Sequence, residues 1–142
     1  MVTRPTELYV SPEGSDRASG TIETPLATIS TARDRVRTLK NTGSISDVSV
    51  YLRGGTYTIS ETVVFGLDDS APDGSTITYC SYRDEEVVLS SGVNLSGWER
   101  ADTDSPDLAD LPAAAQGKIW AADMPRGSER FYTLYVGEHR RC

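Results

Sequence analysis

The chain has 142 residues, with 21 acidic and 14 basic side chains and a formal charge of −7. This acidic balance argues against nucleic acid or an anionic membrane as a partner, because both require clustered lysine and arginine. No run of about 18 apolar residues is present, so the sequence predicts no membrane-spanning segment. Residues 1–7 contain no apolar stretch of the signal-peptide type, so we expect a cytoplasmic protein or a secreted one whose signal has been removed.

Residues that carry nucleophilic or metal chemistry are few. The chain has one histidine, His139, and two cysteines, Cys80 and Cys142. Their spacing matches no metal-binding pair or disulfide framework, and no nucleophile-elbow motif accompanies the histidine. We therefore expect no metal and no cofactor. Cys80 lies in the apolar run 77–82, where we predict that it is buried as a small hydrophobic residue.

The first predicted elements are a short strand and one helix. Apolar residues at 8–10 predict the strand, which a turn-rich segment ends. We predict a helix over 28–42, because its apolar residues recur every three or four positions. These residues are Ile29, Ala32, Val36 and Leu39. Thr28 or Ser30 can cap the start of this helix, and Gly43 can end it.

After the helix the apolar residues alternate, which is typical of strands. The first such run is 48–52, and Gly54 and Gly55 follow it. Two consecutive glycines allow positive φ angles, so we predict a tight corner there. Further β-rich runs lie at 57–59, 62–65, 76–82 and 87–89.

The spacing of these runs indicates a repeating architecture. Val50 and Ile77 occupy similar places in their runs, as do Val63 and Val87. The separations indicate coils of about 25 residues, which favours a strand solenoid over a hairpin sandwich. Such a solenoid would enclose Tyr57, Ile59, Val63 and Phe65.

The composition changes towards the carboxyl end. Residues 101–116 are rich in aspartate, proline and alanine, and we expect a surface excursion there. Two further β-like runs follow at 118–122 and 130–137. We therefore divide the chain into two parts, 1–95 and 96–142.

A succession of short motifs along the chain is informative as a set. The motifs are Leu8-Tyr9-Val10, Gly20-Thr21, Pro25-Leu26, Ala32-Arg33-Asp34, Val50-Tyr51-Leu52-Arg53-Gly54-Gly55, Ile77-Thr78-Tyr79, Val87-Val88-Leu89 and Gly97-Trp98. In this order they resemble the amino-terminal part of bacterial right-handed parallel β-helix glycoside hydrolases of the fucosidase/xylanase-like or xylosidase-like kind. These enzymes have the pectin-lyase-like fold.

The resemblance implies a mainly β fold. Residues 1–95 would form an amino-terminal cap helix and the first β-helix coils. Residues 96–142 would form a small, incomplete β-rich insertion domain, because 117–120 and 134–141 resemble the insertion of such enzymes. The rest of the β-helix would then pack on this segment.

The resemblance also implies an enzyme acting on a polysaccharide or oligosaccharide. Its catalytic carboxylates would lie downstream of this chain, which alone would be inactive. No catalytic residue is therefore assigned here, and the substrate-binding residues stay unknown. A polysaccharide lyase on the same fold and a non-catalytic β-helix module for carbohydrate binding or adhesion are the alternatives.

Paired carboxylates are the residues that glycoside hydrolysis needs. Asp68 and Asp69 are adjacent and precede a turn signal, so we interpret them as turn or capping residues. The acidic residues at 84–86, together with Asp102 and Asp104, are interpreted as solvated loops.

Aromatic and basic residues gather in the second part of the chain. The aromatic residues are Trp98, Trp120, Tyr132 and Tyr135. They could stack on sugar rings, but packing in a small β core is the favoured interpretation. His139-Arg140-Arg141 could bind carboxylates or hydroxyls, although a solvated strand end is favoured there as well.

Overall fold

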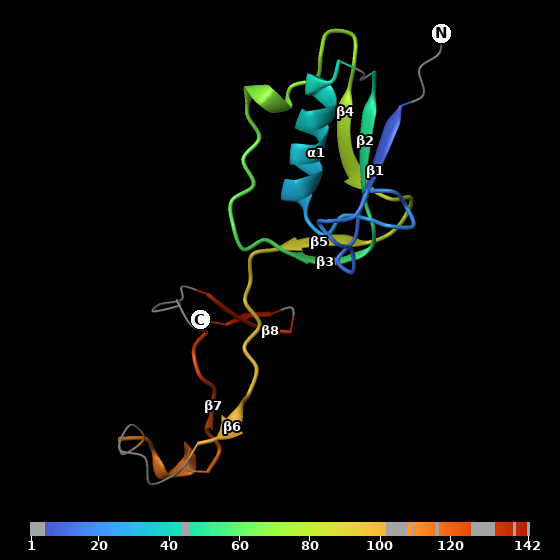
Figure 1. Cartoon of the computed structure of the whole chain (residues 1–142). Coiled ribbons are helices and arrows are strands. Elements are labelled where there is room, and N and C mark those ends of the chain that lie inside the picture. Colours follow the sequence, from blue (N-terminus) through green and yellow to red (C-terminus); the bar gives the residue numbers. More distant parts are fainter. Residues whose placement is uncertain are drawn as a thin grey trace. The chain divides into compact units, whose positions relative to one another are not determined.

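A computed structural model describes residues 5–43, 46–101, 108, 110–115, 117–125, 133–137 and 139–141. The chain divides into two compact units, Met1–Gly92 and Val93–Cys142. In its described part the chain is mainly β, with a single α-helix and small sheets (Figure 1). No helix in that part is long and apolar enough to cross a membrane.

The predicted helix is confirmed as α1, Ile29–Asn41. Thr28 is its N-cap, because the Thr28 hydroxyl accepts a hydrogen bond from the Thr31 backbone N–H at 3.1 Å. The apolar stripe faces the interior, where Ala32 and Val36 are fully or almost fully buried, 0% and 2% exposed. The three-to-four spacing of these residues therefore positions the helix against the core.

Two parallel sheets form the first unit. One has the strand order β1-β2-β4, with β1 at Thr6–Val10, β2 at Val48–Leu52 and β4 at Ile77–Ser81. The other pairs β3, Gly55–Thr58, with β5, Val87–Ser90. The chain thus passes from the first sheet to the second twice, and each later strand lies beside its earlier counterpart.

The core lies between the helix and the inner faces of these sheets. Its buried residues are Leu8, Val10, Leu26, Ala32, Val36, Val48, Val50, Leu52 and Tyr57. The strands supply theirs from alternate positions, because side chains of an extended strand point to opposite faces. Ala32 and Val36 come from α1, and Leu26 comes from the loop before it. Burial of each large aliphatic side chain contributes about 1.5–3 kcal/mol.

The predicted glycine corner between β2 and β3 is confirmed. Gly55 has φ +127°, a backbone conformation that residues with a Cβ rarely adopt. A Cβ at this position would also lie 3.0 Å from Cγ of Pro12. The corner turns the chain from one sheet into the other within a few residues.

The predicted strand at 62–65 is wrong. The segment has no assigned secondary structure and no ladder partner among the described residues. Val64 and Phe65 are 60% and 49% exposed, so Phe65 does not fill the interior as expected. β-branched and aromatic residues favour a strand only where a neighbouring strand and a buried face receive them.

The predicted register also needs correction. Val50 pairs with Tyr79 rather than Ile77, and Val87 pairs with Gly55 rather than Val63. The repeat is therefore nearer to about 30 residues than 25, because the polar turn before β4 takes up more chain than apolar spacing indicates.

The prediction that Cys80 is buried is wrong. In β4, Ile77 and Tyr79 pack against the core, and Cys80 is exposed on the outer face beside Tyr51. The two-residue period of a strand decides this orientation, whatever the hydrophobicity of the run. Cys142 lies outside the described residues.

In its described residues, the second unit contains two short antiparallel pairs. β6, Glu99–Arg100, pairs with β7, Trp120–Ala121, and β8, Leu134–Val136, pairs with β9, His139–Arg141. The predicted β-like runs are confirmed where they contain β7 and β8. A short 3-10 helix at Ala113–Ala115 precedes β7.

Candidate functional site

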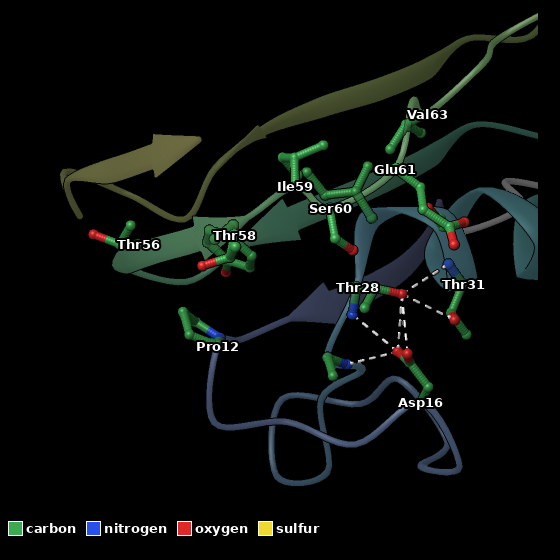
Figure 2. A pocket seen from close by; sticks show the side chains of 14 residues that line it. Pro12, Asp16, Thr28, Thr31, Thr56, Thr58, Ile59, Ser60, Glu61 and Val63 are labelled. Atoms are coloured by element: carbon green, nitrogen blue, oxygen red, sulfur yellow. Dashed lines mark hydrogen bonds between the residues drawn. The ribbon is translucent and has the colours of Figure 1, made fainter. Parts of the chain in front are cut away.

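A groove lies beside β3 in the first unit. Its volume is about 560 Å³. Three segments line it: the loop after β1, the start of α1, and the chain through β3 (Figure 2). The lining residues are Pro12, Asp16, 27–31, 56–61 and Val63. Sequence reasoning missed this groove, because its residues come from segments that are far apart in the chain.

β3 presents a free edge on the groove side. The backbone N–H groups of Gly55 and Ile59 donate to carbonyl oxygens of the chain at β5, at 2.9 and 2.7 Å. Successive residues of an extended strand direct their N–H groups to opposite sides, so those of Thr56 and Thr58 point away from β5. Among the described residues β3 pairs with β5 alone. Unpaired main-chain groups and exposed threonine side chains therefore occur together on this edge.

The two carboxylates of the groove differ in their surroundings. Asp16 accepts hydrogen bonds from the backbone N–H groups of Ala27 and Thr28 at 3.0 and 2.9 Å, and from the Thr28 hydroxyl at 3.0 Å. It therefore anchors the loop to the start of α1. Glu61 is exposed and has no hydrogen bond to another residue in the described part of the chain. Its oxygens are free to accept hydrogen bonds from a ligand.

A cluster of three tyrosines, Tyr9, Tyr51 and Tyr82, lies on the outer side of the β1-β2-β4 sheet. The ring centroids of Tyr9 and Tyr51 are 5.4 Å apart, and those of Tyr51 and Tyr82 are 5.7 Å apart. The ring centroids of Tyr9 and Tyr82 are 5.5 Å apart, and the Tyr9 hydroxyl donates a hydrogen bond to the Glu7 carboxylate at 2.9 Å. Burial, and then the hydrogen bond to Glu7, raise the pKa of Tyr9 to about 12.

Two arginines pack on this cluster. The Arg53 and Arg83 guanidinium carbons lie 5.2 and 4.9 Å from the centroid of the Tyr82 ring. Arg83 has φ +54°, which is uncommon for a residue other than glycine. Sequence reasoning missed the cluster, although tyrosines at outward positions of predicted neighbouring strands were a usable signal.

The interpretation of Asp69 as a turn or capping residue is confirmed. Its carboxylate accepts hydrogen bonds from Nε and Nη2 of Arg37 at 2.7 and 2.8 Å, and from the Gly66 N–H at 2.7 Å. The Arg37 hydrogen bond is the main cause that lowers the pKa of Asp69 to about 2. An acid held this firmly in its ionised form is a poor general acid, and Asp68 beside it is exposed.

The interpretation of 84–86 as solvated acids is wrong for Glu85. Nε of Arg53 donates to Glu85 Oε2 at 2.9 Å, and the Gly54 N–H donates to the same oxygen at 2.6 Å. These contacts hold the pKa of Glu85 below its ordinary value, with Arg53 as the main cause. Glu85 thereby fastens the glycine corner to the next turn, which sequence spacing alone does not reveal.

The remaining sequence candidates fall in the second unit. Trp98, Trp120 and Tyr135 are 47%, 56% and 62% exposed, so the prediction that they form a core is wrong for these three. The Arg100 guanidinium lies 5.9 Å from the centroid of the Trp120 ring. Tyr132, Asp102 and Asp104 lie outside the described residues, as do the side chains of His139 and Arg141, whereas Arg140 is exposed.

Possible metal ligands are not brought together in the described ranges. No group of three or more histidine, cysteine, aspartate or glutamate residues there could hold a metal ion. The groove and the tyrosine cluster are candidate binding features among the described residues of the first unit.

Comparison with known proteins finds two relatives that are similar in sequence. No family model matches the chain. It is 38% identical over 105 residues to "Pectate lyase PEL9" of Emericella nidulans, covering 73% of this chain and 23% of that protein. It is 37% identical over 83 residues to "Uncharacterized protein YwoF" of Bacillus subtilis, covering 58% of this chain and 15% of that protein.

A solved structure described as "Glycoside hydrolase" is similar over most of the chain. The TM-score is 0.78 with 30% identity, covering 95% of this chain and 21% of the other. The chain is therefore similar to carbohydrate-active enzymes in sequence and in structure, and the resemblance drawn from the sequence is confirmed at that level. It spans less than a quarter of the length of each of these relatives.

Proposed function

We propose that this chain is the amino-terminal segment of a carbohydrate-active enzyme, a glycoside hydrolase acting on a polysaccharide or oligosaccharide. The observation that carries the proposal is the likeness to the solved glycoside hydrolase, at TM-score 0.78 over 95% of the chain. The sequence of this chain is also 30% identical to that of the solved glycoside hydrolase. A fold alone would not indicate an activity, because one fold supports many chemistries.

The proposed fold of the whole protein is a right-handed parallel β-helix. Residues 1–95 supply its cap helix and first coils, and 96–142 supply a β-rich insertion. The repeated passage from the first sheet to the second supports this, because stacked coils of a solenoid pair strand with strand in parallel. On the β5 side, Val88 and Leu89 are 43% and 57% exposed. The next coil of the β-helix packs on β4 and β5 and covers the edges that these two strands leave unpaired.

The catalytic carboxylates of this enzyme lie elsewhere in the protein. Glycoside hydrolysis needs an acid and a second carboxylate on either side of the scissile bond. Asp69 and Glu85 are each bound by an arginine, and Asp16 is bound by the start of α1. These three acids serve structural contacts and are unsuited to proton transfer.

A polysaccharide lyase is the second candidate. The 38% identity to a pectate lyase over 105 residues favours it. Lyases cleave the glycosidic bond by elimination and leave an unsaturated uronate, whereas hydrolases add water. The two candidates therefore differ in their products.

The test is an assay of the longest gene product that contains this chain. Aryl xylosides and aryl fucosides report hydrolysis by release of the aryl group, and polygalacturonate reports elimination by the ultraviolet absorbance of the unsaturated product. Aryl release without unsaturated product is the expected result. Unsaturated product alone would establish the lyase, and neither product with retained glycan binding would establish a non-catalytic module.

A further inference from the structure

We propose that the groove between β3 and the start of α1 binds a neutral sugar and excludes uronates. This inference rests on the proposed carbohydrate function and assigns a ligand class to a specific place in the chain. The groove has a volume of about 560 Å³, within the range of about 300–1,000 Å³ that is usual for small-molecule sites.

The groove carries the hydrogen-bonding groups that a sugar requires. Thr56, Thr58 and Ser60 are exposed there, and their hydroxyls have no hydrogen bond to another residue in the described part of the chain. Threonine hydroxyls both donate and accept, as sugar hydroxyls do. The unpaired backbone groups on the same edge of β3 add donors and acceptors. A polyhydroxylated ring can satisfy these groups together.

Apolar surface lies beside these polar groups. Pro12, Ile59 and Val63 line the same groove. A sugar ring has C–H faces as well as hydroxyl edges, so it matches a site in which apolar surface adjoins hydroxyls. Figure 2 shows Pro12 and Thr28 across the groove from the residues of β3.

The charge of the lining selects against acidic sugars. Two lining residues, Asp16 and Glu61, carry carboxylates, and no lysine or arginine belongs to the lining. A uronate entering the groove would meet like charge without a cation to pair with, which is unfavourable. Glu61 instead accepts hydrogen bonds from the hydroxyls of a neutral sugar, which are stronger than bonds between neutral groups.

The test is titration of the purified, isotope-labelled 142-residue chain with two trisaccharides, followed by NMR. Xylotriose is neutral, and trigalacturonate has the same number of rings with a carboxylate on each. Xylotriose should produce saturable shifts at the amides of Thr56, Thr58 and Glu61. Trigalacturonate should produce none at equal concentration.

Matched variants locate the binding. Glu61→Gln keeps the shape but removes the charge, and we expect it to weaken xylotriose binding about tenfold. Glu23→Gln makes the same change on an exposed loop outside the groove and should have no effect. Thr58→Val should weaken binding, whereas Thr78→Val, at an exposed position of β4, should not.

Several results would overturn the inference. They are no saturable binding of xylotriose, equal binding of both trisaccharides, shifts confined to residues outside the groove, and equal effects of Glu61→Gln and Glu23→Gln. The proposed function fails separately, when the longer gene product releases no aryl group. A chain that binds xylotriose in the groove within an inactive parent protein would uphold this inference and refute the hydrolase.

Discussion

The Tyr57 hydroxyl lies 2.9 Å from the carbonyl oxygen of Val10 and donates a hydrogen bond to it. The same carbonyl accepts the backbone N–H of Arg53 at 2.8 Å, and the Arg53 carbonyl oxygen lies 2.7 Å from the Tyr57 hydroxyl. One buried side chain of β3 thus connects the end of β1 with the end of β2. It fixes the corner at which the chain leaves the first sheet.

Replacement of Tyr57 by phenylalanine should destabilise the chain. The ring would stay in place, but the Val10 and Arg53 carbonyl groups would lose a buried donor, which costs about 1–2 kcal/mol. Chemical denaturation followed by circular dichroism measures this loss. Tyr135→Phe is the control, because Tyr135 is 62% exposed and should change the free energy of unfolding little. Equal effects of the two variants would contradict the bridging role.

Glycine at position 14 should be required by close backbone packing. A Cβ on Gly14 would lie 2.2 Å from the Leu26 carbonyl oxygen, so Gly14→Ala must displace the backbone. We expect a loss of about 2–3 kcal/mol, as for other overpacked sites. Gly66→Ala, where a Cβ meets nothing within 4 Å, should be tolerated. Thermal unfolding of both variants checks this, and a Gly14→Ala variant as stable as Gly66→Ala would refute it.

Burial of Val50 should contribute strongly to stability. Val50 is 0% exposed, so Val50→Ala removes packed apolar surface and leaves a cavity. The free energy of unfolding should fall by about 2 kcal/mol. Val88→Ala removes the same atoms from a side chain that is 43% exposed, and we expect a smaller loss there. Urea titration of the two variants compares them, and the prediction fails if Val88→Ala costs as much.

The ion pair of Asp69 with Arg37 should make stability depend on pH. The pKa of Asp69 falls from 3.8 to about 2 in the folded chain. Above about pH 5 the carboxylate is ionised in both states, so its contribution is complete. Between about pH 5 and pH 2 the unfolded chain binds a proton that the folded chain does not, so this stability is lost as the pH falls.

Asp69→Asn isolates this effect. The chain should melt at a higher temperature than the variant at pH 5–7, and the difference should shrink as the pH falls towards 2. Melting curves at several pH values measure it. Asp73→Asn is a suitable control, because Asp73 is exposed and has no ion pair among the described residues. A constant difference between the chain and Asp69→Asn across this range would contradict the depressed pKa.

The 142-residue chain should show no glycosidase turnover by itself. Its structurally engaged acids, Asp16, Asp69 and Glu85, hold fixed contacts rather than an acid and a nucleophile around an open site. An assay with aryl xylosides and fucosides checks this. Hydrolysis that disappears in Asp68→Asn or Asp69→Asn would show that the catalytic pair lies in this chain.

Local pattern was enough to predict several elements. The helix at 28–42, the alternating strand at 48–52 and the glycine corner at Gly54 and Gly55 are each specified by nearby residues. Helical periodicity, two-residue alternation and positive φ angles act over a few positions, so the sequence displays them directly. The motif succession was likewise readable, because it depends on order along the chain.

Other features of the fold depend on which distant segments of the chain pack against each other. Residues 62–65 have the composition of a strand but no described ladder partner, and Cys80 has an apolar run around it yet faces outward. The contacts of Asp69 and Glu85 with arginines join residues about 30 positions apart along the chain.

The sequence by itself therefore determined the helix, the principal strands, the glycine corner and the kind of protein that this chain resembles. The tertiary structure alone decided the register between strands, the hydrogen-bond partners of the acidic residues, and the groove beside β3. The periodicity of apolar residues along the chain determines which way a side chain points. The pairing of distant segments determines which residues that side chain contacts. The groove beside β3 is lined by segments that are distant in the sequence, so only their packing reveals it.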